Sequence, residues 1–314
     1  MNRGVSVAVG LLAGYAADRV LGDPRSFHPV AGFGTAATAL EKRTYGADRW
    51  SGVLHNAILV GATIVGGSVF RGAVPTAVAT WTVLGGTTLA RTGSELADRL
   101  EADDLEGARA LLPSLCGRDP SVLDADGLAR AALESIAENT SDATVAPLFW
   151  GAVAGVPGLV GYRAVNTLDA MVGYRNERYE RFGWASAKVD DVANLAPARI
   201  AGVLTVVLAP LVGGSPQAAA EAWERDSGAH PSPNAGVVEA TMAGALGVTL
   251  GGKTEYPHGI EMRPTLGSGP APGVADLRRA IALSTAIQTG AAVGSAALAV
   301  AVGELVFRRL RRRR

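Results

Sequence analysis

Three carboxylates recur every four residues in the stretch ESIAENTSD at residues 134–142. If this stretch is helical, Glu134, Glu138 and Asp142 share one face, because residues four apart are neighbours on an α-helix. Three like charges on one face repel one another unless a cation compensates them. Carboxylate oxygens are ligands that Mg²⁺ prefers, so the spacing predicts a divalent-metal site that takes a nucleotide phosphate. A solvated acidic helix face is the competing interpretation.

A second group of polar residues lies between residues 162 and 199, in YRAVNTLDAMVGYRNERYERFGWASAKVDDVANLAPAR. The adjacent acids Asp190 and Asp191 would serve a metal ion, and the basic residues would serve phosphate oxygens. The alternative is a salt-bridged surface helix, as Glu177 and Arg181, four apart, suggest. In or near these two stretches we expect substrate to be bound by Asn139, Asn166, Asp169, Arg175, Asn176, Lys188, Asn194 and Arg199.

A third group lies in RDSGAHPSPNAGVVEA at residues 225–240. His230 stands among turn-forming residues that fix an irregular loop. A rigid loop that bears His230 and Asn234 can orient a substrate or move a proton, so we predict a catalytic role for His230 and substrate binding by Asn234. A surface histidine without a role is the alternative.

A fourth motif, GVTLGGKT at residues 247–254, matches the spacing of a phosphate-binding loop. Such a loop works only between a strand and a helix whose first amides face the phosphates. Here EYPHG follows, which cannot open a helix cleanly, and VVEATMAGALG before it has a helical pattern. We therefore predict that this motif does not bind nucleotide.

Composition indicates that membrane helices position these groups. The chain is 48% hydrophobic and only 18% charged, whereas soluble domains carry about a quarter charged residues. Its 40 glycines favour close helix packing in lipid. A formal charge of zero gives no field for nucleic acid, and the single cysteine excludes an internal disulfide. We predict an all-α polytopic membrane protein with long polar helical connections between its spans, forming a single domain over residues 1–314.

Six apolar segments could cross or enter the membrane, at residues 4–17, 51–70, 72–90, 143–161, 200–214 and 281–306. A crossing needs about 20 apolar residues, which favours 51–70, 72–90 and 281–306. The first two of these, separated by Arg71, suggest a helical hairpin. Prolines interrupt 143–161 and end 200–214, so we prefer a re-entrant path for 143–161.

The chain ends in a run of arginines directly after the last apolar segment. Basic residues flanking a span favour the cytoplasmic side, so we expect a cytoplasmic C-terminus in the inner membrane. A disordered basic tail that binds nucleic acid is the alternative. For segment 4–17 the alternative is a signal peptide, which the missing small-residue cleavage site disfavours.

Taken together and in order, these strings resemble one family. DRVLGDPRSFHPV, GRDPS at 117–121, the stretches around 134–150 and 162–199, and HPSPNAGVVEATMAGALGVTLGG are similar to the cobalamin biosynthesis proteins CobD/CbiB. The resemblance extends from about residue 15 to residue 260. Lys253 and Thr254 lie outside the recognised pattern.

The resemblance implies an adenosylcobinamide-phosphate synthase, which joins (R)-1-aminopropan-2-ol or its O-phosphate to the free propionate of adenosylcobyric acid. A carboxylate must be activated before an amine can displace its oxygen, so we expect ATP and Mg²⁺. On this hypothesis the metal is held by Glu134, Glu138 and Asp142, or by Asp190 and Asp191. Arg175, Lys188 and Arg199 would hold phosphate, His230 would deprotonate the amine, and Asn166, Asn176 and Asn234 would position corrin amides.

Two other classes of protein remain open from the residues alone. A membrane prenyltransferase would use NTLD at 166–169 and DDVAN at 190–194 as paired metal sites for a diphosphate. A corrinoid transporter or scaffold would place its charges within spans, near the membrane midplane. For the synthase we expect corrinoid and amino-alcohol substrates, contact with membrane lipid and no nucleic acid, with association into homo-oligomers left open.

Overall fold

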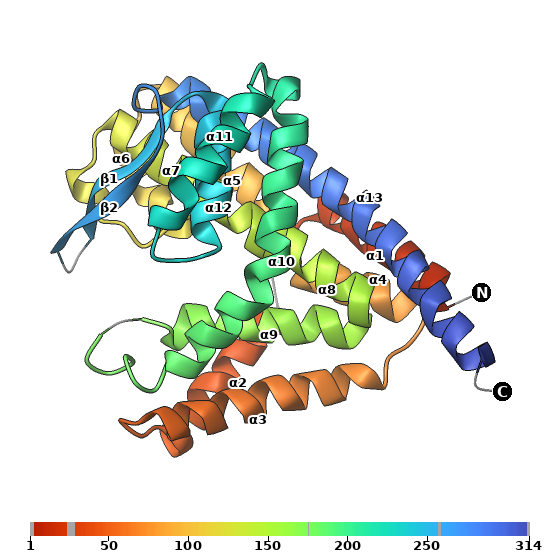
Figure 1. Ribbon diagram of the computed structural model, residues 1–314. Helices are drawn as coiled ribbons and strands as arrows, with labels where there is room; N and C mark the ends of the chain where they lie inside the picture. The colour runs from red at the N-terminus through yellow and green to blue at the C-terminus, as the bar shows by residue number, and fades with distance from the viewer. Residues whose placement is uncertain (1–2, 24–28, 175, 257–258, 313–314) are drawn as a thin grey trace. The chain divides into compact units, whose positions relative to one another are not determined.

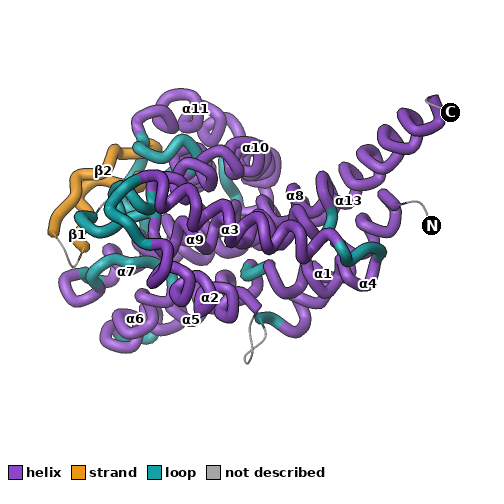
Figure 2. The backbone as a smooth tube through the Cα atoms, turned by 90° about the horizontal axis from the view of Figure 1, so that it is seen from below, coloured by secondary structure: helices purple, strands orange, loops and turns teal. Residues whose placement is uncertain are grey.

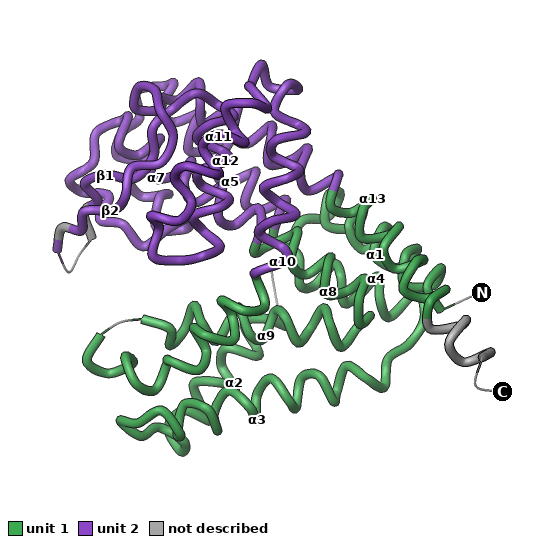
Figure 3. Tube along the Cα trace, in the orientation of Figure 1, with its two compact units in different colours: residues 1–85, 142–194, 291–314 green, residues 86–141, 195–290 purple. Residues whose placement is uncertain are grey.

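The computed structural model describes residues 3–23, 29–174, 176–256 and 259–312, which are helical apart from their connections and one β-hairpin (Figure 1). The predicted all-α membrane class is confirmed. These residues form two compact units, each built from segments that are distant in sequence (Figure 3). Unit 1 comprises residues 1–85, 142–194 and 291–314, and unit 2 comprises residues 86–141 and 195–290.

The described residues of unit 1 form six complete α-helices and parts of two more. The complete helices are α1 (Arg3–Leu21), α2 (Pro29–Thr44), α3 (Arg49–Ser68), α4 (Ala73–Val83), α8 (Ala146–Ala154) and α9 (Val156–Val172). It also takes α10 (Trp184–Leu208) up to Asn194, and α13 (Val274–Arg312) from Ala291 onward.

Glycines bring α1 and α4 of unit 1 into backbone contact. A Cβ atom on Gly10 would lie 2.5 Å from Cβ of Thr76, and one on Gly14 would lie 2.4 Å from Cβ of Thr80. No larger residue fits at either position. This spacing of small residues is the device by which helices associate in lipid, where packing replaces water exclusion.

Unit 2 combines helices with the hairpin. Its helices are α5 (Gly86–Glu101), α6 (Leu105–Leu111), α7 (Ala125–Thr140), α11 (Pro216–Asp226) and α12 (Ala235–Leu246), with the remaining parts of α10 and α13. Strands β1 (Thr249–Tyr256) and β2 (Gly259–Gly267) pair in antiparallel register, with Thr249 opposite Gly267. Every residue of α12 is buried, and α7, α11 and the hairpin pack against it. Helix α12 is therefore the core element of unit 2.

Four described helices are long and apolar enough to cross a membrane. They are Arg3–Leu21, Arg49–Ser68, Trp184–Val212 and Val274–Leu305. The predicted spans 51–70 and 281–306 are thus confirmed as candidate membrane helices, and the shorter segments 4–17 and 200–214 join longer ones. Asp190 and Asp191 lie on the same helix as segment 200–214, which continues through Pro197. They were expected in a connection between spans, and the structure places them on the first part of the helix that contains the candidate span.

The predicted span 72–90 and its hairpin are also wrong. Helix α4 has only 11 residues, and residues 84–85 separate it from α5. Helix α4 packs mainly on α1, whereas α3 packs mainly on α9, so α3 and α4 form no helical hairpin. By contrast, segment 143–161 is broken at Gly155 between α8 and α9, and neither helix is a candidate span. That break is consistent with the predicted re-entrant path.

The context of GVTLGGKT is as predicted. Gly247 ends α12 in a left-handed conformation with φ +72°, and the following residues enter β1. No helix begins after Thr254 among the residues described there, since β2 is the next element. The loop therefore lacks the helix start that a phosphate-binding loop requires.

Candidate functional site

Glu134 is the buried centre of an ion-pair cluster in unit 2. Its Oε2 accepts hydrogen bonds from Arg118 and from Arg263, the latter at 2.7 Å. Its Oε1 accepts a hydrogen bond from the backbone N–H of Gly251 at 2.9 Å. Its side chain is only 3% exposed. Both oxygens therefore bind donors of the chain itself, and the metal-binding role expected for Glu134 remains a prediction.

A β-bulge brings the Gly251 amide to this carboxylate. The register of the hairpin shifts between Leu250 and Gly252, and Gly251 has a φ of +80°. A Cβ atom at Gly251 would lie 2.0 Å from the carbonyl oxygen of Pro264, so only glycine fits. The extra residue of a bulge does not pair with the opposite strand. The backbone N–H of Gly251 is therefore available to donate to Glu134 instead.

Arg263 on β2 ties three elements of unit 2 together. Besides Glu134 on α7, its guanidinium donates to both oxygens of Glu239 on α12, at 2.8 and 3.1 Å. Glu239 is 1% exposed within an apolar helix, and a buried charge is costly unless it is paired and hydrogen-bonded. The hairpin therefore supplies the cation that permits an acid in the core of unit 2.

His230 also faces Arg263. Nη2 of Arg263 lies 2.8 Å from Nε2 of His230. Because a guanidinium can only donate, Nε2 is an acceptor and the imidazole is neutral, with its proton on Nδ1. Burial lowers the pKa of His230, and the charge of Arg263 lowers it further. To act as the predicted base, His230 would first have to release Arg263.

Glu138, one turn after Glu134 on α7, is the solvent-exposed member of this group. The protein packed around the carboxyl group removes part of its hydration and raises its pKa, and the negative charge of Glu239 raises it further. The charges of Arg263 and Arg118 oppose this rise. A carboxyl group with a raised pKa that solvent can reach is suited to proton exchange with a ligand. We call this group the glutamate cluster, comprising Arg118, Glu134, Glu138, His230, Glu239 and Arg263.

Asp142 does not continue the face of Glu134 and Glu138. Helix α7 ends at Thr140, and Ser141–Val145 forms a π-helix. Its i→i+5 hydrogen bonds make a wider turn, which rotates the following side chains away from the α-helical pattern. The prediction of one face is therefore wrong for Asp142, which belongs to unit 1.

In unit 1 a pair of aspartates meets across an amide. Nδ2 of Asn166 on α9 lies 3.4 Å from Oδ2 of Asp142 and 3.5 Å from Oδ1 of Asp190 on α10. Asn194 donates to Oδ2 of Asp190 at 2.9 Å, and the Tyr162 hydroxyl donates to Oδ1 of Asn194 at 2.9 Å. We call Asp142 and Asp190 the aspartate pair. The amides of Asn166 and Asn194 contact it, and the Tyr162 hydroxyl holds Asn194 in place.

A proline and a tryptophan help to fix the α10 side of the pair. Pro197 has no N–H to donate to the carbonyl of Ala193, four residues earlier. The indole N–H of Trp150 on α8 donates to that carbonyl instead, at 3.0 Å. Helix α8 is therefore attached to α10 within one turn of both Asp190 and Asn194.

The aspartate pair fits a metal that also binds nucleotide. Mg²⁺ commonly takes one or two carboxylates and completes its shell with phosphate oxygens and water. The contacts of 3.4 and 3.5 Å from Asn166 are long, hence weak, so a cation could replace them. In the described part of the chain, no three or more His, Cys, Asp or Glu residues are grouped to hold a metal ion. A metal held by protein ligands alone is therefore not supported there.

Asp191 lies apart from the amide network that holds Asp190. Its carboxylate pairs with Lys188 at 3.0 Å, and the two side chains are 30% and 58% exposed. This i, i+3 pair is the salt-bridged surface helix considered as the alternative. Asn176 accepts a hydrogen bond from the Tyr179 amide at 2.9 Å, which closes a turn.

The remaining predicted residues are dispersed. Asn139 donates to Ser135 one turn earlier, at 3.0 Å to the carbonyl oxygen. Arg199 and Asn234 meet at 2.8 Å in unit 2, where Asn234 precedes α12. Asp169 is half-buried near the end of α9. Arg175 lies outside the described residues.

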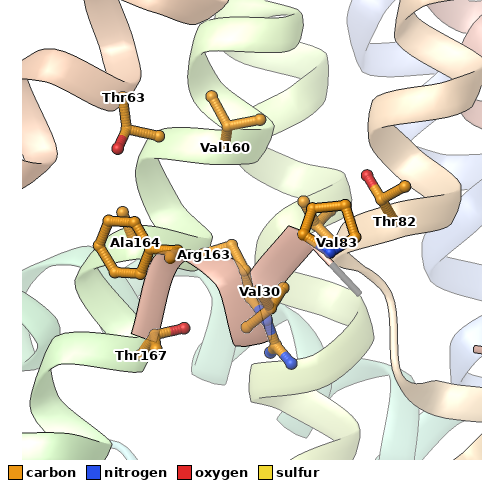
Figure 4. Close-up of a pocket in the computed structure, with 10 residues that line it drawn as sticks. Val30, Thr63, Thr82, Val83, Val160, Arg163, Ala164 and Thr167 are labelled. Atoms are coloured by element: carbon orange, nitrogen blue, oxygen red, sulfur yellow. The ribbon is translucent and has the colours of Figure 1, made fainter. Parts of the chain in front are cut away.

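A recess of about 130 Å³ in unit 1 is lined by Arg163, which lies one turn before Asn166 on α9. Figure 4 shows apolar side chains and three threonines around it, with the guanidinium of Arg163 among them. Arg163 lines the recess and donates to Oδ1 of Asn166 at 3.3 Å, so the contact between Arg163 and Asn166 connects the recess with the aspartate pair. Its Nε is buried, and no described residue accepts a hydrogen bond from it. Arg163 is therefore placed to receive an anion.

Sequence reasoning missed Arg118, Arg163, Glu239 and Arg263. Two of these carried a signal: Arg118 lies in the GRDPS string, and Glu239 is a single acid in the apolar run VVEATMAGALG. A buried carboxylate in an apolar helix is costly unless a cation or hydrogen-bond donor pairs with it. Arg263 gave no signal, because its three partners lie 24, 33 and 129 residues away.

Known proteins match nearly the whole chain. The sequence profile described as "CobD/Cbib protein" matches residues 11–284. A "Cobalamin biosynthesis protein CobD" of Mycobacterium tuberculosis is 57% identical over 293 residues, covering 91% of this chain and 94% of that protein. Proteins of the same name from Rhodobacter capsulatus and Geobacter metallireducens are 42% and 43% identical, covering 88% and 80% of this chain and 90% and 83% of their own lengths.

No solved structure matches the chain. The family is instead shown by the extent of the profile and by the identity of the relatives. The resemblance in the polar stretches is thereby confirmed, and the chain belongs to the CobD/CbiB family.

Proposed function

We propose that this membrane protein acts in cobalamin biosynthesis as an ATP-dependent amide synthase. It would join (R)-1-aminopropan-2-ol or its O-phosphate to the free propionate of adenosylcobyric acid, giving adenosylcobinamide or its phosphate. The family and the names of the relatives support a role in the pathway. The reaction is inferred from the chemistry of the described residues.

The observation that carries the proposal is the aspartate pair beside Arg163. Two carboxylates, Asp142 and Asp190, meet at the amide of Asn166, and Arg163 shares that amide. Acids for a metal and an arginine for phosphate are what a metal–nucleotide complex requires. When bound, Mg²⁺ would neutralise charge on the phosphates as the carboxylate is activated. Asp142 and Asp190 would hold it, and Arg163 would hold a phosphate oxygen.

The chemistry explains why a nucleotide is needed. The oxygen of a free carboxylate is a poor leaving group, so the propionate must first take a phosphoryl or adenylyl group from ATP. The amine nitrogen then bonds to the carbonyl carbon, and phosphate or AMP leaves. The ammonium loses its protons, and a base must accept them for the amide to form.

Glu138 is our candidate for that base. Its raised pKa makes it a better proton acceptor than an ordinary carboxylate, and its exposure lets an ammonium reach it. As a carboxylate it also attracts the ammonium before the proton moves. Glu239 raises the pKa of Glu138 and Arg263 lowers it, without contact with the amine, so we treat these two as positioning residues. His230 remains a second candidate base, limited by its contact with Arg263.

Other roles remain predictions. Lys188 and Arg199 were expected to hold phosphate, and both now have partners on the chain, Asp191 and Asn234. Asn176 and Asn234 were expected to position corrin amides. We further propose that the protein lies in the inner membrane with its C-terminus in the cytosol, because its last helix continues into a run of arginines.

The test uses the full-length protein purified in detergent. It is incubated with adenosylcobyric acid, aminopropanol phosphate, ATP and Mg²⁺, and the corrinoid product and the nucleotide are measured by mass. We expect the amide together with ADP or AMP in equal amounts, and the nucleotide identifies the activated intermediate. Amide formed without consumption of ATP would refute the nucleotide step. Neither product formed by folded protein would refute the synthase.

Two matched variants test the assignment of the site. Asp190→Asn and Asp191→Asn remove the same charge from adjacent positions of α10. We expect Asp190→Asn to reduce amide formation at least about 100-fold and Asp191→Asn to reduce it only severalfold. Equal effects would contradict the aspartate pair while leaving the overall reaction in place.

A further inference from the structure

A second recess of unit 1, of about 370 Å³, lies at the described starts of three helices. Arg3 and Ser6 of α1, Gly72 before α4 and Gly155 before α9 all line it. The end of α3 closes it with Ser68 and with the residues that follow, including Arg71. None of these residues has a role in the proposed amide synthesis.

The recess is electropositive. Arg3 and Arg71 are its charged lining residues, and no acid is among the twelve residues that line it. The start of a helix carries a partial positive charge, because its first N–H groups lack partners within the helix. The starts of α4 and α9, which have no side-chain cap, add to the two arginines, and the hydroxyl of Ser6 adds a hydrogen-bond donor. The hydroxyl of Ser68 already donates to the carbonyl oxygen of Val65 at 2.7 Å. The chemistry suits a phosphate.

The recess also lies at the ends of two candidate membrane spans. One span, α1, begins at Arg3, and the other, α3, ends at Ser68. Beside the arginines are apolar side chains that solvent would reach in the absence of lipid: Val69 is 73% exposed, Phe70 56% and Val74 74%. Cations next to exposed apolar groups at a span end are expected where phosphate headgroups meet acyl chains.

The same end of unit 1 carries the later part of α13. A Cβ atom on Gly4 would lie 2.6 Å from the carbonyl oxygen of Ala299, so α1 and α13 are in backbone contact there (Figure 2). Helix α13 continues from this contact towards the arginines at the end of the chain. By the preference of basic residues for the cytoplasmic side, the recess faces the leaflet that is rich in anionic lipids.

We propose that this recess binds the phosphate headgroup of an anionic membrane phospholipid, held by Arg3 and Arg71 at the starts of α1, α4 and α9. Its acyl chains would cover Val69, Phe70 and Val74. A free phosphate would leave these apolar side chains uncovered, which favours the lipid. The proposal does not rest on the amide synthase.

The experiment titrates the full-length protein in detergent with phosphatidylglycerol, phosphatidylcholine or inorganic phosphate. Bound lipid is counted by native mass spectrometry, and the midpoint of thermal unfolding is recorded. We expect saturable binding and stabilisation by phosphatidylglycerol alone. A basic residue near anionic lipid contributes about fivefold to affinity, so the double variant Arg3→Gln, Arg71→Gln should bind about thirtyfold more weakly. The double variant Arg3→Lys, Arg71→Lys should bind within about threefold of the wild type.

The control is Arg19→Gln with Arg43→Gln, which removes two exposed arginines of unit 1 outside the recess. Equal weakening by both glutamine pairs would show attraction by net charge and would overturn the site. Equal binding of phosphatidylcholine, or equal stabilisation by inorganic phosphate, would overturn the anionic lipid as occupant. Unchanged unfolding of the lipid-free variants, together with retained binding in the lysine pair, separates loss of binding from loss of fold.

Discussion

The glutamate cluster of unit 2 and the aspartate pair of unit 1 contain the same functional group in two different electrostatic settings. Glu134 and Glu239 are buried and bound by arginines, so their charges are balanced by the chain itself. Asp142 and Asp190 meet at the amide of Asn166, through long hydrogen bonds of 3.4 and 3.5 Å, and the charge of Arg163 acts on Asp142. The glutamates are held by direct hydrogen bonds from guanidinium groups, whereas these hydrogen bonds to the aspartates come from a neutral amide. The strength of its hydrogen bonds therefore distinguishes a carboxylate that holds the fold from one whose contacts a ligand can replace.

The largest expected effect comes from breaking the glutamate cluster. Arg263→Met leaves Glu239 and Glu134 buried with one cation fewer, and an unpaired buried charge costs about 3–5 kcal/mol. This is a large part of the stability of a typical domain, about 5–15 kcal/mol. We expect the thermal unfolding midpoint of the purified protein to fall sharply, or folded protein to be lost from the membrane.

Arg130→Met is the matched control for that experiment. Arg130 donates to the carbonyl oxygens of Gly251 and Lys253 on the same hairpin, at 3.1 and 3.0 Å, but these oxygens are neutral. Its loss should cost about 1–3 kcal/mol. If both variants lost the same stability, the carboxylates of the cluster would not need Arg263 as a cation.

A second experiment compares the two regions directly. Glu134→Gln removes the partner of the buried Arg118 and should destabilise the protein by about 3 kcal/mol or more. Asp190→Asn relieves repulsion within the aspartate pair and keeps an oxygen for Asn194, so its unfolding free energy should change by less than about 1 kcal/mol. Amide formation by Asp190→Asn should nevertheless fall at least about 100-fold. If Asp190 were needed for stability and Glu134 were not, the proposed difference between a structural glutamate cluster and a ligand-binding aspartate pair would be contradicted.

The third expectation concerns pH. Glu138 has a raised pKa, from an ordinary 4.5, because burial and the charge of Glu239 disfavour its charged form, so the folded state favours its protonated form. Its contribution to stability is complete below about pH 4.5 and is lost as pH rises through the raised value. His230 has a lowered pKa, so its contribution is present above about pH 6.5 and is lost as pH falls below that.

The variant Glu138→Gln separates these opposing contributions. It should reduce the loss of stability that occurs as pH rises from about 4.5, leaving the dependence on His230 more visible. The measurement is the unfolding midpoint across this range, with Glu106→Gln as a variant that removes an exposed carboxylate outside the cluster. An unchanged pH profile in Glu138→Gln would show that this carboxyl group does not titrate with the fold.

The fold was predictable where composition and length decide the element. Runs such as 51–70 and 281–306 are apolar throughout, and both form long helices. The span 72–90 was predicted wrongly, because hydropathy does not report the break at residues 84–85. We did not predict that Asp190 and segment 200–214 share a helix, because a proline usually marks a helix end. Pro197 instead lies within α10.

The sequence indicated which stretches contain candidate site residues, but it did not indicate which of these residues contact one another. Spacing marked Asp142 and Asp190 as candidate acids, and in the structure both lie near the amide of Asn166. Spacing also grouped Asp142 with Glu134, because the residues SDATV give no sequence signal for the π-helix that they form. Two partners of Glu134, Gly251 and Arg263, could not be found from local patterns, since they lie more than 100 residues away.

The smallest expected effect tests two neighbours that look alike in sequence. Asp190 belongs to the amide network, whereas Asp191 pairs with Lys188 on an exposed part of α10. Exposed ion pairs contribute about 0.2–1 kcal/mol, so Lys188→Ala should change the free energy of unfolding by no more than that. Amide formation should stay within severalfold of the wild type, because the pair holds no part of the proposed metal–nucleotide site. A loss of activity comparable with that of Asp190→Asn would mean that Lys188 binds phosphate, as its position in the sequence first suggested.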